Sequence, residues 1–137
     1  MLAGLSVVLM STFAITPTAS AAGYPSCVGT AVITVSGKSI TVPTVVTSGK
    51  VTIKCVLGKG NSSSAVKALQ NAAIKCYALS VGSVGADGIF GTVTTAAVKS
   101  IQKKGGLTGS QVDGVYGPVT HGVTKFSASC INNTYIV

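Results

Sequence analysis

The chain has 137 residues, a formal net charge of +8, and only two acidic residues, Asp87 and Asp113. This charge favours anionic partners, but the absence of arginine and the scarcity of aromatic residues argue against nucleic acid. Two acids and one histidine are too few for most carboxylate-pair or metal-dependent hydrolases. The composition therefore favours a binding protein, not an enzyme, with no cofactor and no metal.

Residues 1–21 form an uncharged segment with an apolar run from Leu2 to Met10, and it ends on Ala19-Ser20-Ala21. The run is shorter than the roughly 20 apolar residues that span a bilayer, and its small-residue ending suits signal peptidase. We predict a signal peptide at 1–21, and hence a secreted protein that is extracellular or attached to the cell wall. A buried N-terminal helix is the alternative. No lysine precedes the run, which favours a true start codon further upstream.

Residues 22–56 predict a small β-like N-terminal segment of two or three antiparallel strands. The β-branched runs TAVITV, SITVPTVV and KVTIKCV are separated by the turn clusters Ser36-Gly37-Lys38 and TSGK. Pro43 favours an edge position or a bend in the middle run, because it cannot donate to a ladder. Cys27 and Cys55 bracket the segment.

From Leu57 onward the apolar period becomes helical, and three helices are predicted before a C-terminal tail at 131–137. They are SSSAVKALQNAAIKCYAL (62–79), TVTTAAVKSIQKK (92–104) and PVTHGVTKFSASC (118–130). Pro118 suits a first helical position. The residues expected to face inward are Val66, Leu69, Ala73 and Cys76 in the first helix, Val93, Ala97 and Ile101 in the second, and Val119, Val123, Phe126 and Cys130 in the third.

The four cysteines suit an oxidising compartment and allow three disulfide pairings. Cys76 and Cys130 both lie late on the apolar stripes of their helices. In an up-down-up arrangement the first and third helices run parallel, so their C-terminal ends meet. This favours Cys76–Cys130 and leaves Cys27–Cys55, a bond that would tie the ends of the β-like segment.

Two similar phrases, ADGIFGTVTT (86–95) and VDGVYGPVTH (112–121), stand 26 residues apart, and the two acids occupy the same position in each. An Asp in such a place accepts hydrogen bonds from nearby backbone N–H groups, and glycine permits positive φ. Each phrase is therefore predicted to be a loop that fixes a helix N-terminus. The loop-structuring residues are Asp87, Gly88, Gly91, Asp113, Gly114 and Gly117.

These residues resemble the peptidoglycan-binding module of bacterial wall enzymes. LGKGNSSSAVKALQ (57–70) looks like its opening, ADGIFGTVTTAAVKSIQ (86–102) like its D-G-x-F-G-P-x-T-x-x-A-V-x-x-F-Q motif, and VDGVYGPVTHGVTKF (112–126) like its closing repeat. The chain departs from the family pattern at Ser63, Ala73, Thr92 and Ile101. The β-like segment and KCYAL look, more loosely, like small secreted actinobacterial proteins that consist of this module.

The resemblance implies a mainly α fold, a three-helix peptidoglycan-binding-like domain at 57–130, preceded by the disulfide-tied β-like segment. It implies a monomeric, non-catalytic partner of peptidoglycan, with no stable membrane insertion. Phe90, Thr94, Tyr116 and Thr120 are the candidate ligand contacts, in a shallow groove near the repeated loops. Lysines would add attraction to anionic wall polymers, which salt screens.

Two other functions remain open. A cationic secreted effector or protein-binding factor could use the same scaffold, although no helix has the strongly amphipathic basic character of a membrane anchor. A wall hydrolase is the less favoured possibility, because it would depend on Asp87, Asp113 or His121. We expect both Asp side chains to be structural and His121 to be an exposed helical residue.

Overall fold

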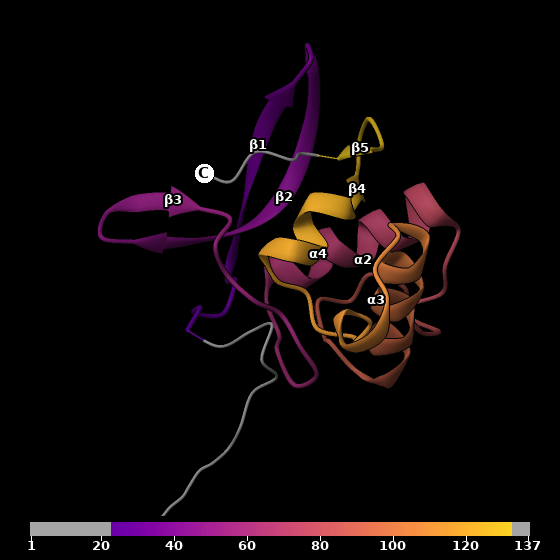
Figure 1. Ribbon diagram of the computed structural model, residues 1–137. Helices are drawn as coiled ribbons and strands as arrows, with labels where there is room; N and C mark the ends of the chain where they lie inside the picture. The colour runs from indigo at the N-terminus through magenta and orange to yellow at the C-terminus, as the bar shows by residue number, and fades with distance from the viewer. Residues whose placement is uncertain (1–22, 133–137) are drawn as a thin grey trace, which may run out of the picture.

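The computed structural model describes residues 23–132 (Figure 1). The predicted signal peptide and most of the predicted tail therefore lie outside the described residues. Within the described part, every helix is too short or too polar to cross a bilayer.

The N-terminal segment is a three-stranded antiparallel sheet in the order β1-β2-β3, as the alternating β-branched runs predict. The strands are β1 (Gly29–Val35), β2 (Lys38–Thr47) and β3 (Lys50–Thr52). Pro43 lies in the central strand, opposite Thr30 of β1. It is tolerated because β3 pairs only with the last part of β2, from Val45 to Thr47, so Pro43 has a ladder partner on one side alone.

Two long helices follow. α2 (Ser64–Tyr77) begins after Ser63, whose side chain accepts a hydrogen bond from the N–H of Val66, and ends at Ala78 in the left-handed conformation. α3 (Thr92–Lys104) ends at Gly105. A short 3₁₀ turn, η3 (Gly109–Gln111), leads to the third helix, α4 (Pro118–Val123). α3 begins and ends at the residues predicted from the sequence.

The third helix is shorter than predicted. α4 ends at Val123 because Thr124 is extended (φ −92°, ψ 132°), and the chain continues as the small hairpin β4 (Lys125–Phe126) and β5 (Ile131–Asn132). Phe126 is buried in this hairpin, not on a helix. The chain is consequently a mixed fold with 33% helix and 28% strand, not the mainly α fold expected.

The apolar positions of the helices were partly misassigned. In α2 the predicted stripe is correct at Val66, Leu69 and Ala73, which are buried. In α3 and α4 the first apolar residue faces solvent instead of the core: Val93 is 45% exposed and Val119 is 53% exposed. Both lie in the first turn of a helix that begins at the surface, so the helical period alone gave the wrong side for them.

One core joins the sheet to the helices. Ile40, Val42 and Ile53 of the N-terminal segment are buried in the same cluster as Leu69 of α2 and Phe126 of β4. Figure 1 shows the sheet beside α2 and α4, while α3 lies on the far side of α2. The sheet therefore contributes to the helical module's core and is not a separate appendage.

Two disulfides fix the periphery of this core. Cys27 is bonded to Cys55, and Cys76 to Cys130, which is the pairing that the sequence favoured. The reasoning for the second bond was wrong in one part, since Cys130 lies in the β4–β5 turn (φ 54°) and not at a helix end. The end of α2 nevertheless lies close enough to that turn for the bond.

The two disulfides are expected to stabilise this small domain, whose core alone is limited in size. Replacing Cys76 and Cys130 by Ser should lower the free energy of unfolding by about 4 kcal/mol. Replacing Cys27 and Cys55 by Ser should lower it slightly less, because that disulfide closes a shorter loop and so restricts the unfolded chain less. Urea unfolding of both double variants beside the oxidised parent would measure this. A loss below about 1 kcal/mol in either variant would contradict the expectation.

Candidate functional site

The two repeated phrases form two loops of the same geometry, here called the first loop (86–91) and the second loop (112–117). In each, the Asp carboxylate accepts the N–H two residues later, Asp87 from Ile89 and Asp113 from Val115, both at 3.0 Å. The following glycines, Gly88 and Gly114, have φ of +80° and +76°. These are Asx turns with a left-handed glycine, as the Asp-Gly pairs predicted.

A buried glutamine on the preceding helix holds each loop. Gln70 of α2 donates its amide to the Asp87 carboxylate (3.1 Å), and its oxygen accepts the N–H of Gly88 (2.8 Å). Gln102 of α3 makes the same pair of bonds with Asp113 and Gly114, each at 3.0 Å. Both glutamines are fully buried. These contacts lower the pKa of Asp87, first through the Ile89 N–H and then through Gln70.

The same glutamines also reach the helix that follows each loop. The Gln70 amide contacts the Thr94 hydroxyl of α3 at 3.1 Å, and the Gln102 amide contacts the Thr120 hydroxyl of α4 at 2.9 Å. We call each set of contacts a glutamine clamp. The sequence analysis did not identify the glutamines as structural. The available signal was their position: each follows a buried Leu or Ile directly and precedes a loop.

Gly91 and Gly117 complete the loops as the N-cap residues of α3 and α4. Their backbones are extended, and their carbonyl oxygens accept the N–H groups of Thr95 (3.0 Å) and His121 (2.8 Å). Neither conformation requires glycine by its φ value. The loop conformation thus depends on the Asp-Gly pair more than on the later glycine.

The four candidate ligand contacts are buried. Phe90 and Tyr116 are 1% and 0% exposed, and Thr94 and Thr120 are 2% and 3% exposed. The ring positions follow from the loops, which turn the aromatic inward, and in the first loop the residue before it, Ile89, faces outward. In this conformation the fold covers these four side chains, and their role as ligand contacts stays a prediction. They support the loops from beneath.

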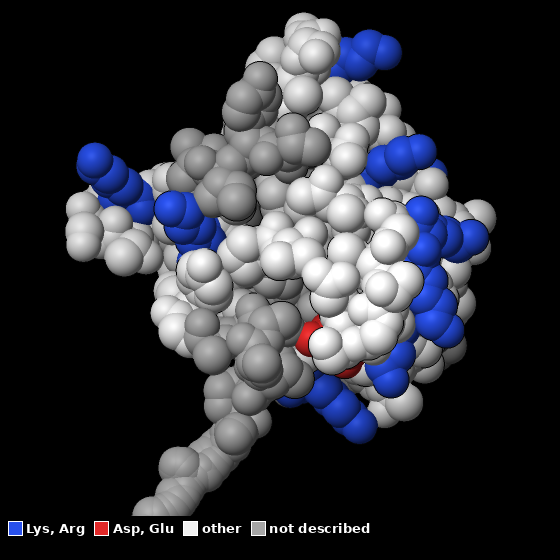
Figure 2. All heavy atoms as spheres, viewed as in Figure 1, with Lys and Arg blue, Asp and Glu red and all other residues white. Residues whose placement is uncertain are grey.

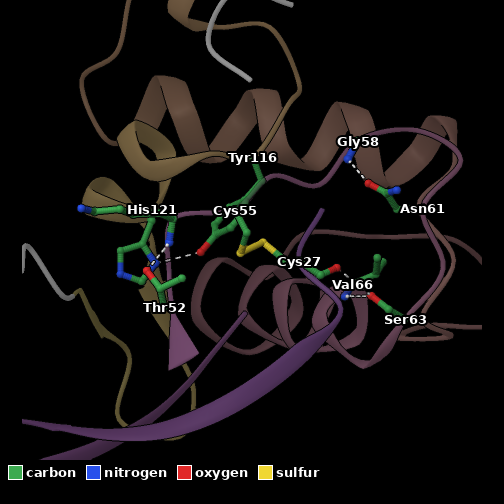
Figure 3. Close-up of a disulfide and its surroundings, with 10 residues drawn as sticks. Cys27, Thr52, Cys55, Gly58, Asn61, Ser63, Val66, Tyr116 and His121 are labelled. Atoms are coloured by element: carbon green, nitrogen blue, oxygen red, sulfur yellow. Dashed lines mark hydrogen bonds between the residues drawn. A yellow bond between two sulfur atoms is a disulfide. The ribbon is translucent and has the colours of Figure 1, made fainter. Parts of the chain in front are cut away.

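The segment from Leu57 to Ser63 lies between the two loops and joins them. Leu57 exchanges two backbone hydrogen bonds with Tyr116 (2.8 and 2.9 Å). Three and four residues later the chain pairs with the first loop: Gly60 donates to the Phe90 oxygen, and Phe90 donates to the Asn61 oxygen, both at 2.9 Å. Between these contacts Gly58 to Asn61 form a tight turn closed by the Asn61 side chain, as Figure 3 shows.

Exposed apolar side chains surround this arrangement. Ile89 of the first loop is 57% exposed, and Val93 and Val119 project from the first turns of α3 and α4. Lys59 is exposed in the turn between the loops. We call Lys59, Ile89, Val93 and Val119 the loop surface. It offers apolar contacts, one cation and the backbone of three adjacent loops.

His121 is buried, at 1% exposure, and is not the exposed residue that was expected. Its Nδ1 lies 2.8 Å from the Tyr116 hydroxyl (Figure 3). The centroid of its ring lies 5.4 Å from that of Phe126. α4 lies against the core on this side, which the helical pattern could not reveal. Burial lowers the pKa of His121 to about 4 and raises that of Tyr116 well above its usual value. Both groups are neutral at pH 7, and the tautomer of the histidine decides which of the two donates this hydrogen bond.

Among residues 23–132, no group of three or more His, Cys, Asp or Glu side chains gathers to hold a metal ion. All four cysteines are bonded in disulfides.

Comparison with known proteins assigns the repeated unit. Residues 62–123 match the family model described as "Putative peptidoglycan binding domain". This part of the chain is a domain of that family. The match spans the first loop, the second loop and both glutamine clamps.

Two curated relatives from Bacillus licheniformis are similar over 65 residues: the N-acetylmuramoyl-L-alanine amidase CwlL, at 48% identity, and a probable N-acetylmuramoyl-L-alanine amidase, at 45%. The aligned part is 47% of this chain and only 17% of each relative. A solved peptidoglycan-binding protein from Clostridioides difficile, in complex with glutamine hydroxamate, is 33% identical, with a TM-score of 0.40 over 61% of this chain and 56% of that one.

The glutamine clamps lead to a stability prediction. Gln102→Leu should lower the free energy of unfolding by about 3 kcal/mol. The buried Gly114 N–H loses its partner, at about 1–3 kcal/mol, and the Asp113 carboxylate and Val115 oxygen each lose one hydrogen bond. Gln70→Leu should behave alike. Gln111→Leu, at an exposed glutamine, is the matched control and should change stability by less than about 0.5 kcal/mol. Equal effects at all three positions would refute the clamp.

Histidine burial gives a pH dependence. With a folded pKa of about 4 and an unfolded pKa near 6.5, the unfolded chain binds the proton first as pH falls. Stability should therefore decline between pH 6.5 and pH 4, by at most about 3 kcal/mol. Chemical unfolding across this range would show the slope, and His121→Gln should flatten it. An equal slope in the variant would assign the effect to another group.

Proposed function

We propose that this protein binds bacterial peptidoglycan without cleaving it. The family match at residues 62–123 is the observation that carries the proposal. The relatives share only this domain with the chain, so the amidase activity in their names is not transferred. The disulfides and a wall-binding domain suggest an extracellular protein.

The proposed contact region is the loop surface, in place of the buried residues first considered. Ile89, Val93 and Val119 are large apolar side chains left in water around loops that the clamps hold rigid. Apolar contacts and backbone groups on a preorganised surface suit the sugar faces and amide groups of a glycopeptide polymer, with little ordering cost on binding. Phe90 and Tyr116 set the loop shape from beneath.

A non-catalytic role is supported by the way the reactive groups are used. The Asp87 and Asp113 carboxylates accept loop N–H groups, and the His121 ring is buried beside Tyr116. An attacking water would need one of these groups as its base, at the cost of a loop or of the core. The cationic effector remains the second hypothesis, since the chain has ten lysines and two acids.

Binding to insoluble peptidoglycan tests the proposal. The oxidised protein should co-sediment with peptidoglycan stripped of teichoic acid, and should still do so at about 0.5 M salt, where exposed charges are screened within a few ångströms. The triple variant Ile89→Ser/Val93→Ser/Val119→Ser should bind about tenfold more weakly or worse, because three apolar contacts are lost.

The matched control is Val32→Ser/Val46→Ser/Val51→Ser, which removes three exposed valines from the sheet. It should bind like the parent. Sedimentation that disappears in salt would support the cationic effector, and equal losses in both variants would exclude the loop surface. Release of free amines or reducing ends from the polymer during incubation would show cleavage and contradict the non-catalytic role.

A further inference from the structure

A cavity of about 630 Å³ opens on another part of the molecule, where α2 and α3 end and α4 passes into β4. Its lining includes three lysines from three different elements, Lys75 of α2, Lys104 of α3 and Lys125 of β4, together with Tyr77 and Asn132. Its volume lies within the range usual for small-ligand sites. None of its lining residues belongs to the loop surface or to the clamps.

The charge of this cavity is of one sign. Neither acid of the chain lines it, and both are engaged in the loops. In Figure 2 lysines lie along the side of the molecule where α3 lies in Figure 1, while the acidic atoms appear apart from most of them, below the centre.

Helix polarity explains only part of this arrangement. Lys75 and Lys104 lie in the last turns of their helices, where a cation interacts favourably with the helix dipole. Lys125 has no such reason, since it lies in a strand after α4. Three like charges around one concavity repel each other, and the repulsion is relieved when an anion enters.

The walls of the cavity are held in place. The Cys76–Cys130 disulfide joins the end of α2 to the β4–β5 turn. The Tyr77 hydroxyl accepts the N–H of Lys125 at 2.9 Å, and the Asn132 amide donates to the Gly122 oxygen at 3.1 Å. Gly105 lies so close to Val123 that an added Cβ would stand 2.5 Å from it. The lysine stems therefore start from a fixed frame.

We propose that this cavity, the basic pocket, binds a phosphate or phosphodiester anion. Three ammonium groups supply up to nine N–H donors and three positive charges. A phosphate group, with its several free oxygens and up to two negative charges, matches them better than a carboxylate, and lysine is a common phosphate ligand. The pocket is independent of the loop surface, so the protein would hold two different components through two faces.

The direct test uses inorganic phosphate as the probe. The oxidised full chain is titrated with phosphate and, separately, with acetate at equal ionic strength, and binding is followed by calorimetry and by amide chemical shifts. Phosphate should bind at least tenfold more tightly than acetate and should shift the amides of residues 75–78, 104–105 and 125.

Two charge-matched variants decide whether the pocket is responsible. Lys75→Gln/Lys104→Gln/Lys125→Gln should weaken phosphate binding at least tenfold, whereas Lys38→Gln/Lys50→Gln/Lys67→Gln, which removes the same charge elsewhere, should change it by less than about threefold. Equal losses in both variants would overturn the proposal in favour of non-specific attraction. Equal affinity for acetate and phosphate would overturn the assignment to phosphate.

The source of the anion is tested with bacterial walls. If the ligand is a wall phosphodiester polymer, the pocket variant should bind untreated walls less than the parent does, and the difference should vanish once acid has removed that polymer. If the difference survives this treatment, the wall polymer is excluded as the source. Binding of the pocket variant to stripped peptidoglycan should equal that of the parent, so failure of the pocket and failure of the loop surface give different results.

Discussion

The rest of the helical module depends on the two glutamine clamps. Each glutamine satisfies its own amide and connects three parts of the chain: Gln70 links α2 to the first loop and to Thr94, and Gln102 links α3 to the second loop and to Thr120. Each loop leads directly into the next helix. The clamps therefore join the three helices in series by the same polar contact, and a polar network in which every member has a partner specifies one arrangement.

The clamps also divide each repeated phrase into a buried and an exposed half. The Asp-Gly turn sends the aromatic inward, where Phe90 and Tyr116 pair through the backbone with the Leu57–Ser63 segment. It leaves Ile89 in water, with Val93 and Val119 following at the helix starts. A side chain that is apolar, exposed and fixed on a rigid loop is suited to contact. The aromatic ring of each loop, by contrast, is buried in the core.

Local patterns predicted the features that neighbouring residues determine. The Asp-Gly pairs gave the turns, the β-branched runs gave the sheet, and Ser63 and Gly105 gave the ends of α2 and α3 correctly or nearly so. What the sequence could not show was which surface a segment meets. Phe126 and Cys130 continue the helical spacing of α4, but strand pairing replaces the helix after Val123. His121 is buried between Tyr116 and Phe126, each five residues away in sequence, but the helical spacing did not show that these rings meet.

The use of the acids explains the unusual electrostatics of the surface. Both carboxylates serve as hydrogen-bond acceptors within the clamps, at sites fixed by the repeat. The lysines are spread over the remaining surface with no other acid among the described residues to balance them. In most places a lone exposed lysine is simply solvated. Where three elements converge on the basic pocket, lysines meet in a concave site, and there the counter-charge must come from a bound anion or from the solution. Because both carboxylates are used inside the fold, the lysines of the basic pocket have no acidic side chain in its lining and can interact with an anion from outside.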